Sequence, residues 1–282
     1  MITFADNVTA PLVRQMWKIC FGDTEEFMDI FFTDKYRNEN TLIYIEDNMP
    51  VASLQMLPYT ITFYGETIPF AYLAGLCTLP EYRRRGYMEQ LILEAHSVLS
   101  QRGIPLAILI PAEDWLYGFY EKYGYQQVFD KSEELIPLNK ILEQYPDIDE
   151  AYRAFDSLFR ETDFCVQKSR EDFNTIISEY IGDNCPPKTN LSGMARVIDP
   201  WVLLKLYADK NKMTKLRLEV EDDTTYLIKN GWVEAIDGLD GDIKIDIRML
   251  CRLLFGYKTD KLDKSLSTLF PLHHPVMNFM LE

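Results

Sequence analysis

The amino-acid sequence predicts an α/β protein whose first 130 residues form a mixed sheet, followed by a helical connector and a small α+β unit. Three observations support this prediction. Strand-like and helical patterns alternate through residues 1–130, and four prolines interrupt the largely helical residues 131–193. From residue 194 onward, strand-like runs predominate between two helical segments. The expected units therefore span residues 1–130, 131–193 and 194–282.

The first unit shows strand and helix patterns in the order β, α, α, β, β, β, α, β, α, β. Alternating or apolar runs predict strands, which we place at residues 1–4, 41–47, 51–65, 66–79, 104–110 and 125–129. Amphipathic runs predict helices at residues 9–20, 23–32, 86–101 and 113–122. Gly65 supplies a tight turn between the two longest strands. This order is typical of an α/β domain with a mixed sheet.

The connector contains two helical stretches, within residues 141–161 and 170–182, and is too short for another complete α/β domain. In the last unit, a strand at residues 196–198 precedes a helix that Pro200 starts from its first turn. The remaining pattern predicts strands at residues 214–222, 224–230, 231–237 and 242–247, and a closing helix at 249–257.

The composition narrows the classes of function. A net charge of −15 repels phosphate backbones and anionic lipids, so neither nucleic acid nor a membrane surface is the expected partner. A cationic partner fits this charge, although acidity also serves solubility alone. The first residues lack the basic start and apolar region of a secretory signal, and no run approaches the about 18 apolar residues of a membrane span. We therefore expect a cytoplasmic protein.

Cysteine and histidine spacing does not predict a metal site or a disulfide framework. The cysteines lie far apart, contain no CxxC pair and are odd in number, at positions Cys20, Cys77, Cys165, Cys185 and Cys251. His96 has no second ligand at helical spacing, and His273 and His274 are adjacent in a loop pattern. We expect reduced thiols and no metal.

The most informative segment joins a strand to a helix through three arginines. The strand ends at Thr78, Pro80 stops its pairing, and Arg83–Arg85 lead through Gly86 directly into a helix. Only nine Lys or Arg residues occur among the first 130, against seventeen acids, so this concentration is unusual. A helix start with free N–H groups, and a glycine that permits close backbone approach, predicts a phosphate or pyrophosphate site. A solvated basic turn is the alternative.

Common nucleotide motifs are absent: the sequence contains neither GxxxxGK[ST] nor a GxGxxG that opens a βαβ unit. Arg83, Gly86 and Met88 instead resemble the pyrophosphate loop of the GNAT superfamily of acyl-coenzyme A (CoA) N-acyltransferases, [Arg/Gln]-x-x-Gly-x-[Gly/Ala]. Met88 departs from the last position. Arg-Arg-Arg-Gly before two bulky residues, and the later FYEKYGYQQV, resemble the enhanced intracellular survival type of this superfamily.

This resemblance implies a GNAT-like mixed sheet at the N-terminus and a sterol-carrier-protein-like α+β domain at the C-terminus. Longer members carry a second GNAT unit where this chain has only its connector. Acetyl-CoA is then the implied co-substrate. The resemblance assigns its pantetheine arm to the strand Leu76-Cys77-Thr78 and its pyrophosphate to the loop formed by Arg83, Arg84, Arg85, Gly86, Tyr87 and Met88.

Two catalytic roles follow from the same resemblance. Tyr120 corresponds to the tyrosine that protonates the departing CoA thiolate, and the terminal carboxylate, here on Glu282, corresponds to the base. Simple packing of Tyr120 and an ordinary docked tail are the alternatives, and other candidate groups are His273, His274 and Glu113. Cys77 is expected to be a small buried hydrophobe rather than a nucleophile.

The resulting hypothesis is an N-acetyltransferase that moves an acetyl group to an amine of a small or peptidic, cationic acceptor. Two other classes stay open: a non-catalytic acyl-CoA or lipid-binding module on a degenerate GNAT fold, and a purely structural partner protein. Retention of Arg84, Gly86 and Tyr120 favours catalysis, whereas Met88 and the short connector weaken it. The sequence is also compatible with a homo-oligomer.

Overall fold

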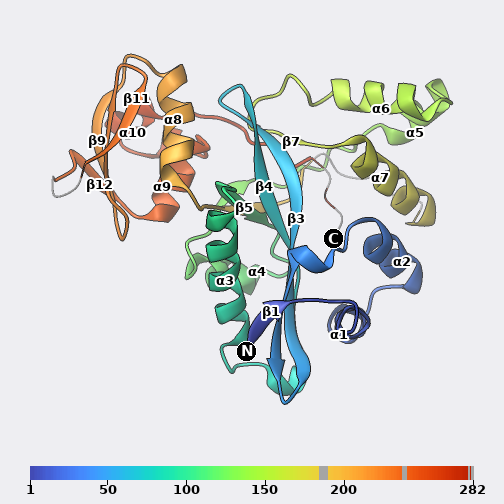
Figure 1. The fold of residues 1–282 in the computed structure, drawn as a ribbon. Helices are drawn as coiled ribbons and strands as arrows, with labels where there is room; N and C mark the ends of the chain where they lie inside the picture. The colour runs from blue at the N-terminus through green and yellow to red at the C-terminus, as the bar shows by residue number, and fades with distance from the viewer. Residues whose placement is uncertain (184–189, 237–239, 279, 281–282) are drawn as a thin grey trace.

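The computed structural model describes residues 1–183, 190–236, 240–278 and 280 (Figure 1). Its main element is an eight-stranded mixed sheet in the order β1-β2-β3-β4-β5-β8-β6, with β7 paired separately to β3. Its strands are β1 (Ile2–Phe4), β2 (Thr41–Glu46), β3 (Met49–Phe63), β4 (Glu66–Thr78), β5 (Leu106–Leu109), β6 (Gln126–Phe129), β7 (Val166–Gln167) and β8 (Gly193–Val197). Among the described strands of this sheet, only β4 and β5 run parallel. The mixed α/β fold is therefore confirmed.

Helices cover both faces of this sheet. On one face lie α1 (Ala10–Phe21) and α2 (Glu25–Asp34), and on the other lie α3 (Tyr87–Gln101) and α4 (Asp114–Glu121) (Figure 1). Short 3₁₀ turns, η1 (Asn38–Asn40) and η2 (Pro80–Tyr82), precede β2 and the arginine segment. The predicted turn between the two longest strands is confirmed, because β3 and β4 form one hairpin with positive φ at Tyr64 and Gly65.

The connector forms α5 (Leu138–Gln144), α6 (Ile148–Ser157) and α7 (Arg170–Asp183), with β7 between the last two. Pro146 lies between α5 and α6 and Asp147 caps α6, which explains why the first helical stretch divides. A compact apolar cluster around Phe155 and Phe173 holds these helices together. Figure 1 shows the connector and the C-terminal unit on opposite sides of the β3–β4 hairpin.

The C-terminal unit has its own four-stranded sheet in the order β11-β10-β9-β12. Its elements are α8 (Pro200–Lys210), β9 (Lys215–Val220), β10 (Thr225–Lys229), β11 (Trp232–Ile236), β12 (Ile243–Ile245), α9 (Ile247–Leu254), η3 (Thr259–Lys261) and α10 (Lys264–Leu269). The predicted start of α8 at Pro200 is confirmed, and Asp199 caps it by accepting a bond from the Val202 N–H. The unit joins the first sheet through α9, which contacts β8 and β6.

One predicted strand is in the wrong sheet. We expected residues 196–198 to begin the C-terminal unit, but β8 pairs antiparallel with both β5 and β6 in the first sheet. The physical reason is burial on both faces: Met194 packs toward α3 and α4, whereas Ala195 and Val197 join the opposite core. Only an interior position of the large sheet covers both sides of such a strand.

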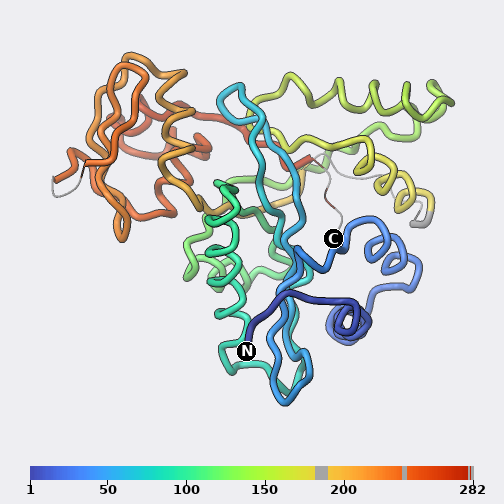
Figure 2. The backbone as a smooth tube through the Cα atoms, in the orientation of Figure 1, coloured from blue at the N-terminus to red at the C-terminus, as the bar shows by residue number. Residues whose placement is uncertain are grey.

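The tail of the chain returns to the first sheet. Figure 2 shows the backbone leaving the C-terminal unit and passing back toward β7. There the Val276 N–H donates to the Phe164 carbonyl at 2.9 Å, and the Val166 N–H donates to the Val276 carbonyl at 3.0 Å. Among the described residues, no helix is long and apolar enough to cross a bilayer.

Candidate active site

The site begins where the two parallel strands part. β4 and β5 are in register only at Ala71–Ala107 and Tyr72–Ile108. Beyond Ile108 the short β5 ends at Leu109, whereas β4 continues to Thr78. The β5-facing edge of β4 from Leu73 onward therefore has no strand partner within the described chain. Its N–H and C=O groups can pair with the amides of an extended ligand.

A bulge marks the inner end of this open edge. The β3–β4 register shifts between Ser53 and Gln55, opposite Gly75. A Cβ on Gly75 would lie 2.4 Å from the Trp17 ring, so the close approach of α1 requires glycine there. The amide of Gln55 lies next to Gly75 and is buried, yet neither its nitrogen nor its oxygen has a hydrogen-bond partner among the described residues. A buried amide of this kind is an available donor and acceptor for a ligand.

The outer end of the edge runs into the arginine loop. Arg84 and Gly86 both adopt positive φ, of 64° and 80°, and α3 starts directly afterwards without a side-chain cap. The first N–H groups of α3 are consequently free to bind an anion. Arg83 Nε donates to the Thr78 carbonyl at 3.1 Å, which ties the loop to the end of β4. Arg84 has no hydrogen bond or ion pair with any described residue, so its charge is available.

The two bulky residues after Gly86 point into the protein. The Tyr87 ring stacks on Tyr44 at 4.3 Å, and its hydroxyl bonds to the Glu46 carboxylate. Met88 packs partly buried against the cluster between the sheet and α3. Arg85 lies 3.6 Å from the same Glu46 carboxylate. Large side chains therefore follow Gly86 without covering the backbone of the loop.

The strand that the resemblance assigned to the pantetheine arm, residues 76–78, lies on the open edge of β4. Leu76 and Thr78 are half-buried, and Cys77 is buried with its sulfur 3.2 Å from the Ser53 hydroxyl. A hydrogen bond with Cys20 and burial raise the pKa of Cys77 well above its usual value, so the thiol stays protonated. This agrees with Cys77 as a buried apolar side chain and not a nucleophile.

Tyr120 belongs to the apolar cluster that lines the α3 face of the same strands. It is 6% exposed and belongs to the same apolar cluster as Leu73 of β4, against which Met88 packs. Its ring meets that of Tyr125 edge-on at 5.9 Å. Burial raises the pKa of the phenol, which therefore carries its proton throughout the neutral range. Such a group can act as an acid but not as a resting base.

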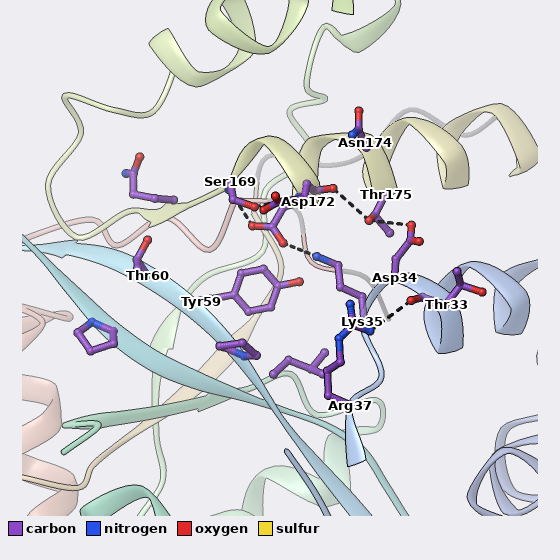
Figure 3. Close-up of a pocket in the computed structure, with 15 residues that line it drawn as sticks. Thr33, Asp34, Lys35, Arg37, Tyr59, Thr60, Ser169, Asp172, Asn174 and Thr175 are labelled. Carbon is purple, nitrogen blue, oxygen red and sulfur yellow. Dashed lines mark hydrogen bonds and ion pairs between the residues drawn. The ribbon is translucent and has the colours of Figure 1, made fainter. Parts of the chain in front are cut away.

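The opposite face of the sheet carries a cavity of about 720 Å³ between the end of α2, the middle of β3 and the start of α7 (Figure 3). In Figure 3, Lys35 reaches from α2 to Asp172 on α7, beside the ring of Tyr59. Arg37 is bound to the backbone carbonyls of Thr33 and Tyr36. The cations of this cavity thus already have partners, whereas the exposed Glu171 carboxylate has none among the described residues.

Asp34 adds a second acid to the same cavity, where its carboxylate accepts a hydrogen bond from the Thr175 hydroxyl at 3.0 Å. That bond occupies one oxygen and leaves the second available. With Glu171, the cavity therefore presents two carboxylates that form no ion pair with a described residue, against the single unpaired charge of Arg37. A cationic ligand suits it better than an anion.

A buried lysine forms the inner boundary of this region. Lys168 is 5% exposed, and its amine lies 2.8 Å from the Met280 sulfur and 4.7 Å from the centre of the Tyr59 ring. Burial lowers the pKa of Lys168 to about 7, although Asp172 opposes the shift. Because Met280 contacts Lys168, the described part of the C-terminal tail ends near Tyr59.

This buried amine predicts a pH effect on stability. The unfolded chain binds a proton at Lys168 up to a pH of about 10.4, whereas the folded chain releases it near pH 7. The free energy of unfolding should thus rise with pH across this window, by up to about 1.4 kcal/mol per pH unit. In urea denaturation, the free energy of unfolding of Lys168→Met should rise less with pH than that of the wild type. The exposed-site control Lys140→Met should show the same rise as the wild type. An equal slope in all three proteins would contradict the assignment.

The other residues that the sequence offered as catalytic candidates lie in different parts of the chain. His273 stacks on Phe164 at 4.3 Å near the hairpin end of β3, so the structure does not bring it to the open edge of β4. Glu113 precedes α4, is exposed and accepts a bond from Trp115. Glu282 lies outside the described residues. Within those residues, no group of three His, Cys, Asp or Glu side chains could hold a metal.

Sequence reasoning missed Gln55, Lys168 and the acids around Asp172. Lys168 and Asp172 belong to the connector and reach β3 and α2 only in the folded chain. Lys35 and Asp172, which are paired there, are 137 residues apart in the sequence. Gln55 carried one detectable signal: it is a polar residue inside an otherwise apolar strand.

Comparisons with known proteins bear on this site. Residues 6–128 match the model of the family described as an acetyltransferase (GNAT) domain. No curated protein matches the chain. The N-terminal part of the chain is thus similar to an acetyltransferase (GNAT) domain, and the matched residues include both the open edge and the arginine loop.

Solved structures match the whole chain in fold. A GCN5-related N-acetyltransferase from Anabaena variabilis has a TM-score of 0.65 at 16% identity, covering 99% of this chain and 100% of that one. Eis1 from Mycobacterium abscessus has a TM-score of 0.64 at 11% identity, covering 100% and 99%. A GCN5-related N-acetyltransferase from Kribbella flavida has a TM-score of 0.63 at 12% identity, covering 100% and 97%. At these identities the likeness concerns the fold, and the sterol-carrier-like character of the C-terminal unit stays a prediction.

Proposed function

We propose that this protein is an N-acetyltransferase that moves the acetyl group of acetyl-CoA directly to an amine of a small or peptidic, cationic acceptor. The observation that carries the proposal is the continuity of the open β4 edge with the arginine loop inside an acetyltransferase (GNAT) domain. An extended, amide-containing arm that ends in a pyrophosphate has the chemistry that this path recognises.

The residues present fit acetyl-CoA in this path. The backbone of Leu76, Cys77 and Thr78 would pair with the pantetheine amides, and the N–H groups from Arg84 to Met88 would bind the pyrophosphate. Arg84 supports this assignment because it has no partner among the described residues and lies in a positive-φ turn at the helix start. Arg83 and Arg85 hold the loop against β4 and Glu46.

The amine would approach from the opposite face, through the cavity between α2, β3 and α7. Asp34 and Glu171 would attract its positive charge, and Gln55 could orient the amine or the acetyl carbonyl at the bulge. In the reaction, the amine nitrogen bonds to the thioester carbonyl carbon and the carbon–sulfur bond breaks. Tyr120 gives its proton to the departing thiolate, and a base takes the proton that the amine loses.

For the base we propose the terminal carboxylate of Glu282. The described tail reaches Met280 beside Lys168 and Tyr59, and two further residues span at most about 7 Å. The last described residue of the tail thus lies near Tyr59, which lines the acceptor cavity, and this supports the proposal.

Calorimetric titration with acetyl-CoA and thiol release with a panel of amines test the proposed function. The panel should include monoamines, polyamines and peptides with a free α- or ε-amine. We expect saturable binding of acetyl-CoA and release of CoA with at least one cationic amine. Binding without turnover would identify an acyl-CoA-binding module, and the absence of binding would refute both readings.

The proposed base gives a separate prediction. Removal of residues 281 and 282 moves the terminal carboxylate back to Met280, and it should lower turnover by about 10² or more while acetyl-CoA affinity is retained, because the proton acceptor is displaced by two residues. Glu282→Gln is the matched control: it keeps the terminal carboxylate and should retain activity. If the truncated protein turns over at the wild-type rate, the terminal carboxylate is not the base.

A further inference from the structure

A second cavity lies between the first sheet and the C-terminal unit, apart from the proposed reaction path. It measures about 500 Å³ and is bordered by α3, the end of α4, β8, the β9–β10 turn and the start of α9. His96, on its wall, follows the first residue of α3 by nine positions, which corresponds to roughly 13 Å along the helix. The cavity is therefore well separated from the arginine loop.

Arg196 of β8 lines this cavity and lacks a partner. No hydrogen bond or ion pair joins it to any described residue, and its Nε is buried. It lies in the middle of the strand, opposite Ala107 of β5, and lines the cavity together with His96 of α3 and Ile247 of α9. Arg196 is partly buried with a buried Nε, and a charge in such a position without a counter-charge is costly, so the site favours an anion.

The ionisable groups packed against Arg196 supply no negative charge. His96 donates to or accepts from the Tyr125 hydroxyl at 3.1 Å, and burial together with the charge of Arg196 lowers the pKa of His96 to about 3. Burial raises the pKa values of Tyr125 and of Cys251 on α9, so both stay neutral. The positive charge at the floor of the cavity is therefore uncompensated within the described chain.

The floor is shaped around the guanidinium. A Cβ on Gly124 would lie 1.9 Å from Arg196 Nη1 and 2.9 Å from the Ile247 side chain. Any larger residue at position 124 would displace the arginine. This close contact fixes the guanidinium of Arg196 against the backbone of Gly124, which carries no negative charge.

The rim of the cavity has the opposite charge. Arg248 lies 3.3 Å from Glu121 and 3.4 Å from Asp246, so these two acids are paired. Glu221 and Asp222, in the exposed turn after β9, have no side-chain partner among the described residues. A ligand that fits both ends has an anion for the floor and a cation for the rim.

We propose that this cavity binds a free amino acid, or a small zwitterion of the same chemistry, with its carboxylate on Arg196 and its ammonium group toward Glu221 and Asp222. The ammonium group of such a ligand is attracted to the acidic rim, whereas the two negative charges of a phosphate would be repelled by it. A carboxylate attached to an ammonium group is therefore favoured over a phosphate. The volume is within the range of small-molecule sites. The site is distinct from the proposed transfer path and does not depend on it.

The test uses the full chain and each of the twenty common L-amino acids as probes, in thermal-shift and calorimetric titrations. At least one amino acid should bind saturably, and the acid that lacks its amino group should bind more weakly. Arg196→Met should weaken binding by about 10- to 100-fold, the usual effect of losing a charged hydrogen bond. Arg217→Met, an exposed arginine on β9, is the matched control and should bind as wild type. The absence of binding by every amino acid would overturn the proposal.

The unliganded proteins give an independent readout. If Arg196 waits for a ligand, Arg196→Met should melt at the wild-type temperature or above, because an unpaired buried charge is removed. A lower melting temperature, with no change in ligand response, would show a purely structural arginine and reject the site. Glu221→Gln with Asp222→Asn should abolish the preference for the amino acid over its deaminated acid.

Discussion

Replacement of Tyr120 by phenylalanine is expected to lower turnover by about 10² to 10⁴ while the affinity for acetyl-CoA is unchanged. The substitution keeps the ring that packs with Tyr125 and removes only the hydroxyl. Because burial raises the pKa of this phenol, the wild-type group is protonated whenever a thiolate forms. The measurement is CoA release at saturating acetyl-CoA with an active amine, together with the melting temperature.

Tyr125→Phe is the matched control, since it removes a buried hydroxyl from the same cluster. That hydroxyl bonds to His96, so its loss should cost about 1 kcal/mol of stability and leave the rate nearly intact. If Tyr120→Phe turns over like wild type, Tyr120 serves packing alone. Tyr117, Tyr123 or water would then be the source of the proton.

Gly86→Val is expected to abolish measurable binding of acetyl-CoA, by at least about 100-fold, in a protein that still folds. Gly86 has a φ of 80°, which a β-branched residue adopts only with strain, and the new side chain would stand over the N–H groups of α3. The protein around it is open, with only Glu89 at 4.0 Å from the added Cβ, so the fold should tolerate the change. Calorimetry measures the affinity.

Gly103→Val controls for the backbone strain alone. Gly103 follows the other end of α3, has a φ of 66°, and has no atom within 4 Å of an added Cβ. It should lose a similar amount of stability and keep its affinity for acetyl-CoA. Wild-type affinity in a folded Gly86→Val protein would remove the pyrophosphate from this loop.

The local features of the site could be predicted because they depend on neighbouring residues. The β3–β4 turn at Gly65 and the start of α3 after Gly86 follow from local backbone chemistry. The match of residues 6–128 to the acetyltransferase (GNAT) family model agrees with the resemblance that the arginine loop indicated. Propensity and periodicity act over a few residues, so such features are readable from sequence alone.

The features that were missed depend on distant partners. A short apolar strand such as β8 looks the same whether it enters a small or a large sheet, and only the open edges of β5 and β6 decide its place. Gln55 and Lys168 are ordinary polar residues until burial leaves one without a bond and shifts the pKa of the other. The surroundings of Arg196 likewise depend on Gly124 and His96, which lie far from it in the sequence.

The insertion of β8 between β5 and β6 also constrains how the chain folds during synthesis. The ribosome must add more than sixty residues after β6 before β8 emerges, so the central sheet has high contact order. At about 5 to 20 residues per second, this gap lasts several seconds. During that time β5 exposes an unpaired edge and β6 has no strand partner, and both can pair with another chain. A nascent chain that stops near residue 130 would hold the arginine loop, yet it could not close its sheet and would depend on chaperones to remain unaggregated.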